Sequence, residues 1–380
     1  MIALFASTLG VGLIFGFQPP LIALVLSRSG ASSFAIGSVT AVSLIAVIAL
    51  GPVYPRIIGR LGLKGCIVFG VSTAAAILLC MGIWRTITAW LGLRFLSGCV
   101  LGLAWIGSEV WMNVASGAAS RGMVMGIYGA VFSTGVVLGP LLLELTGTSG
   151  WKPFVCGAVC LSLTLVPLAM LREAKPEIHA ARSTGSLIRC VRFAPLVMGA
   201  ALVAGLVESA DLALLPLFGL HSGLSDRGSL TLLAVFMAGN VVLQLPIGLL
   251  ADRFGRRRLL GCCALLSVLG PLLLPWCISA PVLLGPLLFV WGGTLYAFYS
   301  QGIALLGEEF PASELAAANT AFVIVYCAGG VVGPSLGGLA MDLWPGFGLP
   351  VLLSAAPLVL IAGLARGALG AKPSSRRRTP

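Results

Sequence analysis

Charged residues are scarce in this chain of 380 residues. Asp, Glu, Lys and Arg together make up 9% of it, and 58% of the residues are hydrophobic. Soluble domains carry about 25% charged residues. A polypeptide this apolar cannot cover a water-facing surface of ordinary size, so the composition excludes a soluble globular protein.

The sequence also lacks the residue patterns of most catalytic sites. It has two histidines and ten cysteines, and none of them stands at metal-ligand or disulfide-framework spacing. No glycine-rich loop precedes Lys and Ser or Thr, which is the phosphate-binding pattern of ATP-driven pumps. We therefore expect no enzyme, no metal site and no cofactor.

Long apolar runs dominate the chain instead. About 20 apolar residues are enough for a helix to cross a bilayer. The first run lacks a basic leader and is too long for a signal peptide, so we expect it to be retained as a span. The sequence predicts an all-α membrane protein with twelve transmembrane helices, at residues 2–26, 34–54, 64–84, 87–113, 122–144, 152–171, 194–220, 229–250, 259–278, 282–306, 315–340 and 347–369.

The basic residues predict the orientation of these spans. The net charge is +11, but Lys and Arg lie in the gaps between apolar runs, which disfavours nucleic-acid binding. With the N-terminus inside, eighteen of the 23 basic residues fall on the cytoplasmic side and four outside. Cytoplasmic loops collect Lys and Arg. We therefore expect a multi-pass protein of the bacterial cytoplasmic (inner) membrane, with both termini in the cytoplasm.

The chain reads as two related halves. The polar stretch 172–193 is the predicted cytoplasmic linker between six-helix bundles at 1–171 and 194–369, and 370–380 is a basic tail. A shift of 193–194 residues aligns landmarks across five helices, for example Trp105 with Tyr299. Parallel repeats of six spans are one architecture of secondary transporters, with the substrate site near the midplane between the halves.

One motif is specific. GLLADRFGRRR, at 248–258, resembles the cytoplasmic signature of the major facilitator superfamily, with Asp252, Arg253, Gly255 and Arg256 at its main positions. The repeat places a weaker copy at 55–64, where Gly59 stands in place of the aspartate.

Further motifs are similar to those of the same superfamily. RFLSG at 94–98 resembles the arginine element of this superfamily. The sequence at 94–109, 245–256 and 292–309 is similar to that of its YcaD-type bacterial branch. Two stretches resemble the glycine-proline signature of drug/proton antiporters and also have the spacing of close helix packing. Their residues are Gly135, Gly139, Pro140, Gly329, Gly333 and Pro334.

This resemblance implies the major facilitator fold and alternating-access transport of a small molecule. Proton-coupled efflux by a monomer is the favoured mode, because the antiporter-like motifs imply it. Two alternatives stay open. One is a proton-independent uniporter or uptake carrier, and the other is a non-transporting membrane sensor or scaffold.

Charged residues inside spans are costly, so each is a candidate site residue. Glu208 and Asp211 stand three residues apart on one helix face near the middle of their span. Close carboxylates in a low dielectric favour holding a proton, which predicts proton coupling or substrate contact. Arg94 and Glu109 share another span, and Arg94 lies at a depth where it can pair with Asp211. A structural role is the alternative for each.

Aromatic and amide side chains predict the cavity wall. Aromatic walls with a few polar groups are typical of ligand pockets, although packing explains such residues as well. The candidates are Gln18, Trp105, Asn240, Gln244, Trp291, Phe298 and Tyr299.

The signature at 248–258 also predicts a conformational latch. Asp252 stands at the cytoplasmic end of its span, and the repeat places the start of the span at 122–144 opposite it. A carboxylate there can accept hydrogen bonds from a helix N-terminus. We expect Asp252, Arg253, Gly255 and Arg256 to hold the two halves together on this side.

Overall fold

The computed structural model describes residues 2–115, 121–169, 184–310 and 312–370, and the regular elements in this part are all α-helices. Most of the predicted linker, 172–183, and nearly all of the predicted tail, 371–380, lie outside the described residues.

Seven helices form the first half of the chain. They are α1 Ile2–Arg28, α2 Ser33–Leu50, α3 Tyr54–Ile83, α4 Ile87–Ala115, α5 Arg121–Thr146, α6 Lys152–Leu163 and α7 Leu165–Ala169.

Another seven helices form the second half. They are α8 Thr184–Phe193, α9 Pro195–His221, α10 Asp226–Phe254, α11 Arg256–Cys277, α12 Pro281–Glu309, α13 Ala312–Leu343 and α14 Gly348–Gly370. The short α8 occupies the end of the predicted linker and packs on α13.

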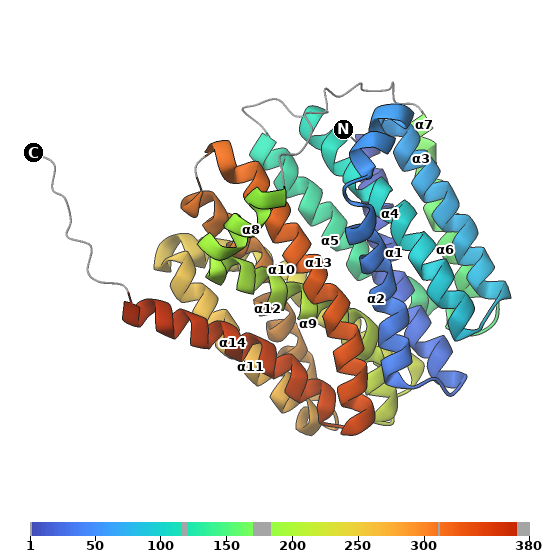
Figure 1. The fold of residues 1–380 in the computed structure, drawn as a ribbon. Helices are drawn as coiled ribbons and strands as arrows, with labels where there is room; N and C mark the ends of the chain where they lie inside the picture. Colours follow the sequence, from blue (N-terminus) through green and yellow to red (C-terminus); the bar gives the residue numbers. More distant parts are fainter. Residues whose placement is uncertain (1, 116–120, 170–183, 311, 371–380) are drawn as a thin grey trace, which may run out of the picture.

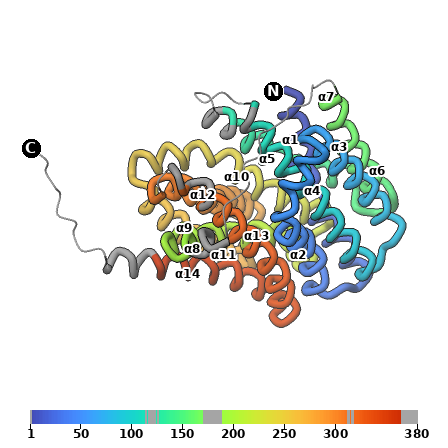
Figure 2. The backbone as a smooth tube through the Cα atoms, turned by 45° about the horizontal axis from the view of Figure 1, so that its top comes forward, coloured from blue at the N-terminus to red at the C-terminus, as the bar shows by residue number. Residues whose placement is uncertain are grey.

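The structure confirms the twelve-span fold. Over the described residues, eleven segments are long and apolar enough to cross a membrane, and Gly348–Gly363 within α14 is a further apolar helix. The first-half helices gather on one side of the molecule and most second-half helices on the other (Figures 1 and 2). The halves meet where α2 packs on α13, α5 on α10 and α1 on α9.

Two spans differ from their predicted form. The sixth is broken into α6 and α7, and the Thr164 N–H bonds to Leu161 O only three residues back. Pro167 in α7 has no N–H to continue the α-helical ladder to Leu163, which explains the break. The third is preceded by a helical stretch that begins at Tyr54, and Gly62, with a φ of 72°, separates this stretch from the helix of the span predicted at 64.

The backbone repeats what the sequence predicts as an internal duplication. Gly62 and Gly255, aligned by the 193-residue shift, both have positive φ, a conformation in which a side chain is strained. A Cβ on Gly12 would clash with Phe132 O, and one on Gly205 would clash with Tyr326 O. These contacts are also equivalent under the shift. Close backbone packing of α1 on α5 therefore recurs as α9 on α13.

The predicted packing motif lies in these same contacts. A Cβ on Gly135 or Gly139 would clash with the backbone of α1, and one on Gly329 or Gly333 with the backbone of α9. Pro334 contributes at another interface, because its carbonyl oxygen leaves no room for a Cβ on Gly37 of α2. Pro140 is buried within α5.

The alternating direction of the spans gives the molecule two ends. We call the end where α1 begins and α7 ends the linker face, at the top of Figure 1. We call the other end, where α1 meets α2 and α13 meets α14, the opposite face.

Candidate functional site

A cavity of about 510 Å³ lies between the two halves, with walls from both. The predicted residues that line it are Gln18, Arg94, Trp105, Glu109, Glu208, Asn240, Gln244 and Tyr299. Its volume is within the ~300–1,000 Å³ typical of small-molecule sites. The structure therefore brings most of the predicted site residues together.

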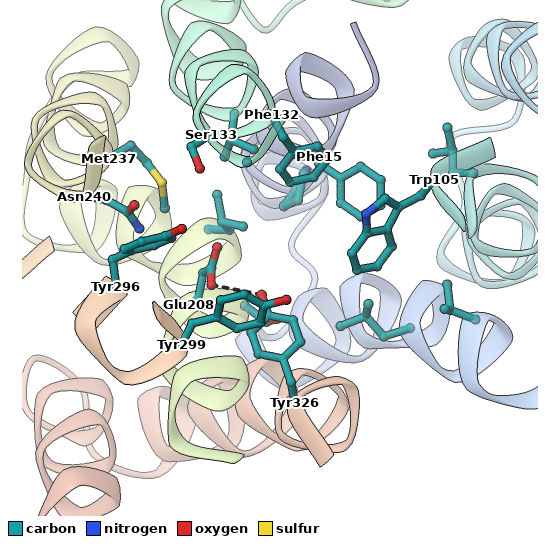
Figure 3. Close-up of a pocket in the computed structure, with 18 of the residues that line it drawn as sticks. Phe15, Trp105, Phe132, Ser133, Glu208, Met237, Asn240, Tyr296, Tyr299 and Tyr326 are labelled. Atoms are coloured by element: carbon teal, nitrogen blue, oxygen red, sulfur yellow. Dashed lines mark hydrogen bonds between the residues drawn. The ribbon is translucent and has the colours of Figure 1, made fainter. Parts of the chain in front are cut away.

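The second half contributes a carboxylate among tyrosines. Glu208 on α9 is partly buried, and its Oε2 accepts a hydrogen bond of 2.9 Å from the hydroxyl of Tyr326 on α13. The ring of Tyr299 on α12 packs edge-on against Tyr326, with 5.2 Å between ring centroids. Tyr296, one turn earlier on α12, completes the group around Glu208 in Figure 3.

The first half contributes a purely aromatic group. Phe15 on α1 lies 5.8 Å from the ring of Trp105 on α4 and 5.7 Å from that of Phe132 on α5. Trp105 and Phe132 are stacked, with 6.1 Å between centroids. These rings face the cavity across from Glu208 (Figure 3).

The two groups are equivalent under the repeat. The shift of 193–194 residues places Phe15 on Glu208, Trp105 on Tyr299 and Phe132 on Tyr326. Because close packing of α1 on α5 recurs as α9 on α13, each position has the same orientation in its own half. At these equivalent positions the cavity thus has three aromatic rings in the first half, and a carboxylate with phenol hydroxyls in the second.

Arg94 does not form the predicted pair with Asp211. Its guanidinium is 5% exposed and donates to Gln18 Oε1, to Ser43 Oγ at 2.7 Å and weakly to Thr40 O at 3.5 Å. These partners all belong to the first half. The shared depth of Arg94 and Asp211 did not bring them together, because polar groups on α1 and α2 are closer to Arg94.

Asp211 itself lies outside the cavity wall. It is fully buried, and neither carboxylate oxygen has a hydrogen-bond partner among the described residues. Glu208 and Asp211 therefore share a helix but not an environment.

Two predicted aromatic residues are also outside the cavity. Trp291 is 1% exposed and packs against Phe236 and Gly270, and Phe298 is fully buried. Both belong to the packing of the second bundle, so their prediction as cavity residues is wrong. The sequence alone does not show which face of an apolar helix an aromatic residue occupies.

Other lining residues were missed by the sequence-based prediction. Tyr296 stands three residues before Tyr299, and helix periodicity could have identified it. Phe15 and Tyr326 had no such signal, because each stands in an apolar, glycine-rich run. The remaining polar and aromatic residues of the lining include Thr40, Ser43, Tyr128, Phe132, Ser133, Ser209, Ser300 and Asn319.

At the linker face, the signature residues pair within their own half. Asp252 accepts a hydrogen bond of 2.8 Å from Arg256, four residues later. Arg256 also donates to Glu308 at 3.0 Å, and Arg257 donates to Glu309 at 2.8 Å, both at the end of α12. Arg253 and Gly255 belong to the same turn between α10 and α11. Among the described contacts of Asp252 in this conformation, none is the predicted one with α5.

At the opposite face, polar contacts join the two halves. Asp226 at the start of α10 is bonded by Arg28 and by Thr148, which belong to the first half. Arg227 donates to Glu144 of α5 at 2.5 Å. These contacts hold the bundles together at the opposite face.

A second link at the opposite face uses a helix N-terminus. The carboxylate of Asp342 on α13 accepts from the backbone N–H groups of Ser33 at 2.8 Å and of Phe34 at 2.9 Å. These N–H groups are the first of α2, which the helix itself cannot satisfy. The described polar contacts thus join the two halves at the opposite face, whereas those of the signature at the linker face lie within the second half.

The chain belongs to the major facilitator superfamily. The superfamily's sequence model matches residues 1–238 and 228–380. The chain is 27% identical to the uncharacterised transporter YfkF of Bacillus subtilis, over 92% of this chain and 91% of that protein. It is 26% identical to the uncharacterised transporter YcaD of Escherichia coli, over 76% and 74% of the two chains.

Solved structures show the same fold. The nucleoside transporter NupG superposes with a TM-score of 0.78 at 15% identity, over 98% of this chain and 99% of that one. An inward-facing, unoccupied bacterial homologue of the human lysosomal transporter Spinster gives 0.74 at 16% identity, over 96% and 95%. The protein is therefore a membrane transporter of the major facilitator fold, with the cavity where the two bundles meet.

Proposed function

We propose that this protein exports a small molecule from a bacterial cell in exchange for protons, and that Glu208 carries the proton. The observation behind this proposal is the position of Glu208. Its carboxylate is in the cavity between the bundles, and its one hydrogen bond among the described residues comes from a neutral phenol, that of Tyr326. A carboxylate without a cationic partner in a low dielectric holds a proton readily.

The groups around Glu208 support a reversible proton site. Tyr326 approaches it from α13, Tyr296 and Tyr299 come from α12, and Asp211 lies one turn further along α9. None of these groups carries a positive charge, and Arg94 donates its hydrogen bonds to partners on α1 and α2. Loss or gain of a proton at Glu208 therefore changes the net charge of the cavity wall.

Orientation follows from the basic residues. With the linker face in the cytoplasm, Arg253, Arg256 and Arg257 stand at the cytoplasmic ends of their helices, as cytoplasmic loops prefer. The contacts of Asp226 and Asp342 then close the cavity toward the outside, and this conformation is the one that loads cytoplasmic substrate. The two halves of one chain suffice to line the cavity, so the proposed transport in the cytoplasmic membrane needs only a monomer.

Reconstituted vesicles with a trapped pH-sensitive dye test the proposal. A panel of small solutes is added under an imposed pH gradient, and proton movement and solute movement are recorded together. We expect solute-dependent proton flux in the wild type, and Glu208→Gln to lose it while solute exchange at equal pH continues. Exchange needs only alternation of the loaded carrier, whereas coupling needs a proton released in each cycle.

The matched control is Glu309→Gln, which removes a carboxylate that is paired within the second half and lies outside the cavity. Transport without proton flux in the wild type would instead establish the uniporter or uptake carrier. No transport of any solute by folded protein would favour the sensor or scaffold.

A further inference from the structure

The two walls of the cavity differ in charge at equivalent positions. Phe15, Trp105 and Phe132 form the aromatic part of the first-half wall, and Glu208, Tyr299 and Tyr326 occupy the equivalent places in the second. A ligand that spans both walls meets rings at one end and a carboxylate between phenols at the other.

The carboxylate end suits a positive charge. Tyrosine rings attract a cation within about 6 Å of the ring centroid, through the negative face of the π system. Glu208 adds a full negative charge when ionised, and no described residue forms a salt bridge with it. A cationic group is the partner that this end of the cavity lacks.

The remaining charges of the wall agree with this assignment. Among the described lining residues, the carboxylates are those of Glu208 and Glu109, and the one basic residue is Arg94. Arg94 is 5% exposed and bonded to Gln18 and Ser43, so it offers little surface to an anion. The charge that the described residues place around the tyrosines is therefore that of Glu208, which attracts cations and repels anions when ionised.

We propose that the substrate class is an organic cation with an aromatic or otherwise apolar body. Its ammonium group lies against Glu208 and the rings of Tyr296, Tyr299 and Tyr326. Its apolar body lies against Phe15, Trp105 and Phe132. This assignment rests on the proposed transport function and adds the chemistry of the transported molecule. The cation and the proton compete for Glu208, so loading one releases the other.

Three probes with one body test the head charge. They are (2-naphthylmethyl)trimethylammonium, 2-naphthylmethanesulfonate and 2-naphthylmethanol. Binding of each to purified protein is measured separately by equilibrium dialysis at one pH, with protein-free micelles subtracted. A charge-assisted contact of about 1.4 kcal/mol is tenfold in affinity. We expect the ammonium probe to bind at least ~10-fold more tightly than either of the others.

Variants separate the two walls. Glu208→Gln is expected to weaken the ammonium probe about tenfold and to change the other two less than about twofold. Phe132→Leu removes a ring from the opposite wall and should weaken all three probes by a similar factor. Tyr326→Phe keeps the ring but not the hydroxyl bonded to Glu208, and should keep the preference for the cation. Glu309→Gln, outside the cavity and paired within the second half, should change none of them.

Tightest binding of the sulfonate, or an unchanged preference in a folded Glu208→Gln variant, would overturn the assignment. Binding of none of the three by protein with a normal melting transition would overturn it as well. These results would leave proton-coupled transport of another solute class intact, because the binding assay uses no gradient. Loss of solute-dependent proton flux in vesicles, with cation binding retained, would instead remove the proposed coupling.

Discussion

The link between Asp342 and α2 provides a direct test of how this conformation is held. Asp342 belongs to the second half, and the N–H groups of Ser33 and Phe34 that donate to it belong to the first. If this contact exists only while the opposite face is closed, then weakening it should favour opening of that face. The substitution Asp342→Asn removes the charge and replaces one accepting oxygen with a donor.

The magnitude follows from the two bonds. A carboxylate at a helix N-terminus contributes about 0.3–1 kcal/mol when exposed and up to ~2 when partly buried. The Ser33 bond is partly buried and the Phe34 bond is exposed, so about 1–2 kcal/mol is expected. That energy changes the ratio of two conformations by about 5–30-fold.

Spin labels measure the ratio. Cysteines introduced at Ser29 and Ser222, in a protein without its ten native cysteines, place one label on each half at the opposite face. Double electron–electron resonance then gives the populations of short and long distances. We expect Asp342→Asn to raise the share of the long distance by the factor above. Glu309→Gln, which breaks a pair within the second half, should leave it unchanged.

An unchanged ratio in Asp342→Asn would refute the reasoning. If the melting temperature fell while the ratio stayed constant, the contact would persist in both conformations and would act as an ordinary helix cap. A similar shift in Glu309→Gln would show that loss of any surface acid has this effect.

Four further predictions follow from the same contacts. Glu208→Gln should abolish solute-dependent proton flux without stopping exchange at equal pH, as vesicle assays would show. Protease added to inside-out vesicles should cut within 172–193 and leave two fragments of similar size, whereas protease on the outside should not. Gly205→Ala should lower thermal stability in detergent by about 1–3 kcal/mol, because its Cβ would clash with a backbone oxygen, while Gly285→Ala, with open space around it, should not. Asp252→Asn should raise the share of this conformation in the spin-label assay, because the variant loses a latch that only the alternative conformation can form. An unchanged share would argue against that latch.

The sequence predicted the fold well because a bilayer demands it. Apolar length predicts the spans, and the basic residues and the 193-residue shift predict their grouping. The sequence predicted the ends and interruptions of the helices less well. The break at Thr164 depends on Pro167, and the kink within α3 depends on the positive φ of Gly62, and neither feature changes hydropathy.

The site was predictable where charge marked it. Glu208, Arg94 and Glu109 stand out in apolar spans, and all three line the cavity. The position of a residue along its helix did not predict which way its side chain faces, however. Asp211, chosen for its charge, and Trp291, chosen as an aromatic residue, are both buried among other helices.

The alignment of Phe15 with Glu208 shows that the sequence repeat alone does not identify the residues of the cavity. The shift aligns these two residues, but it aligns dozens of other pairs as well. The rotation of each helix selects among them, and close glycine contacts set that rotation. Gly12 against Phe132 O and Gly205 against Tyr326 O turn α1 and α9 by the same amount. Once both helices are oriented, the residue one turn further on, Phe15 or Glu208, faces the cavity in each half. The duplicated backbone thus presents a ring in one wall and a carboxylate at the equivalent place in the other.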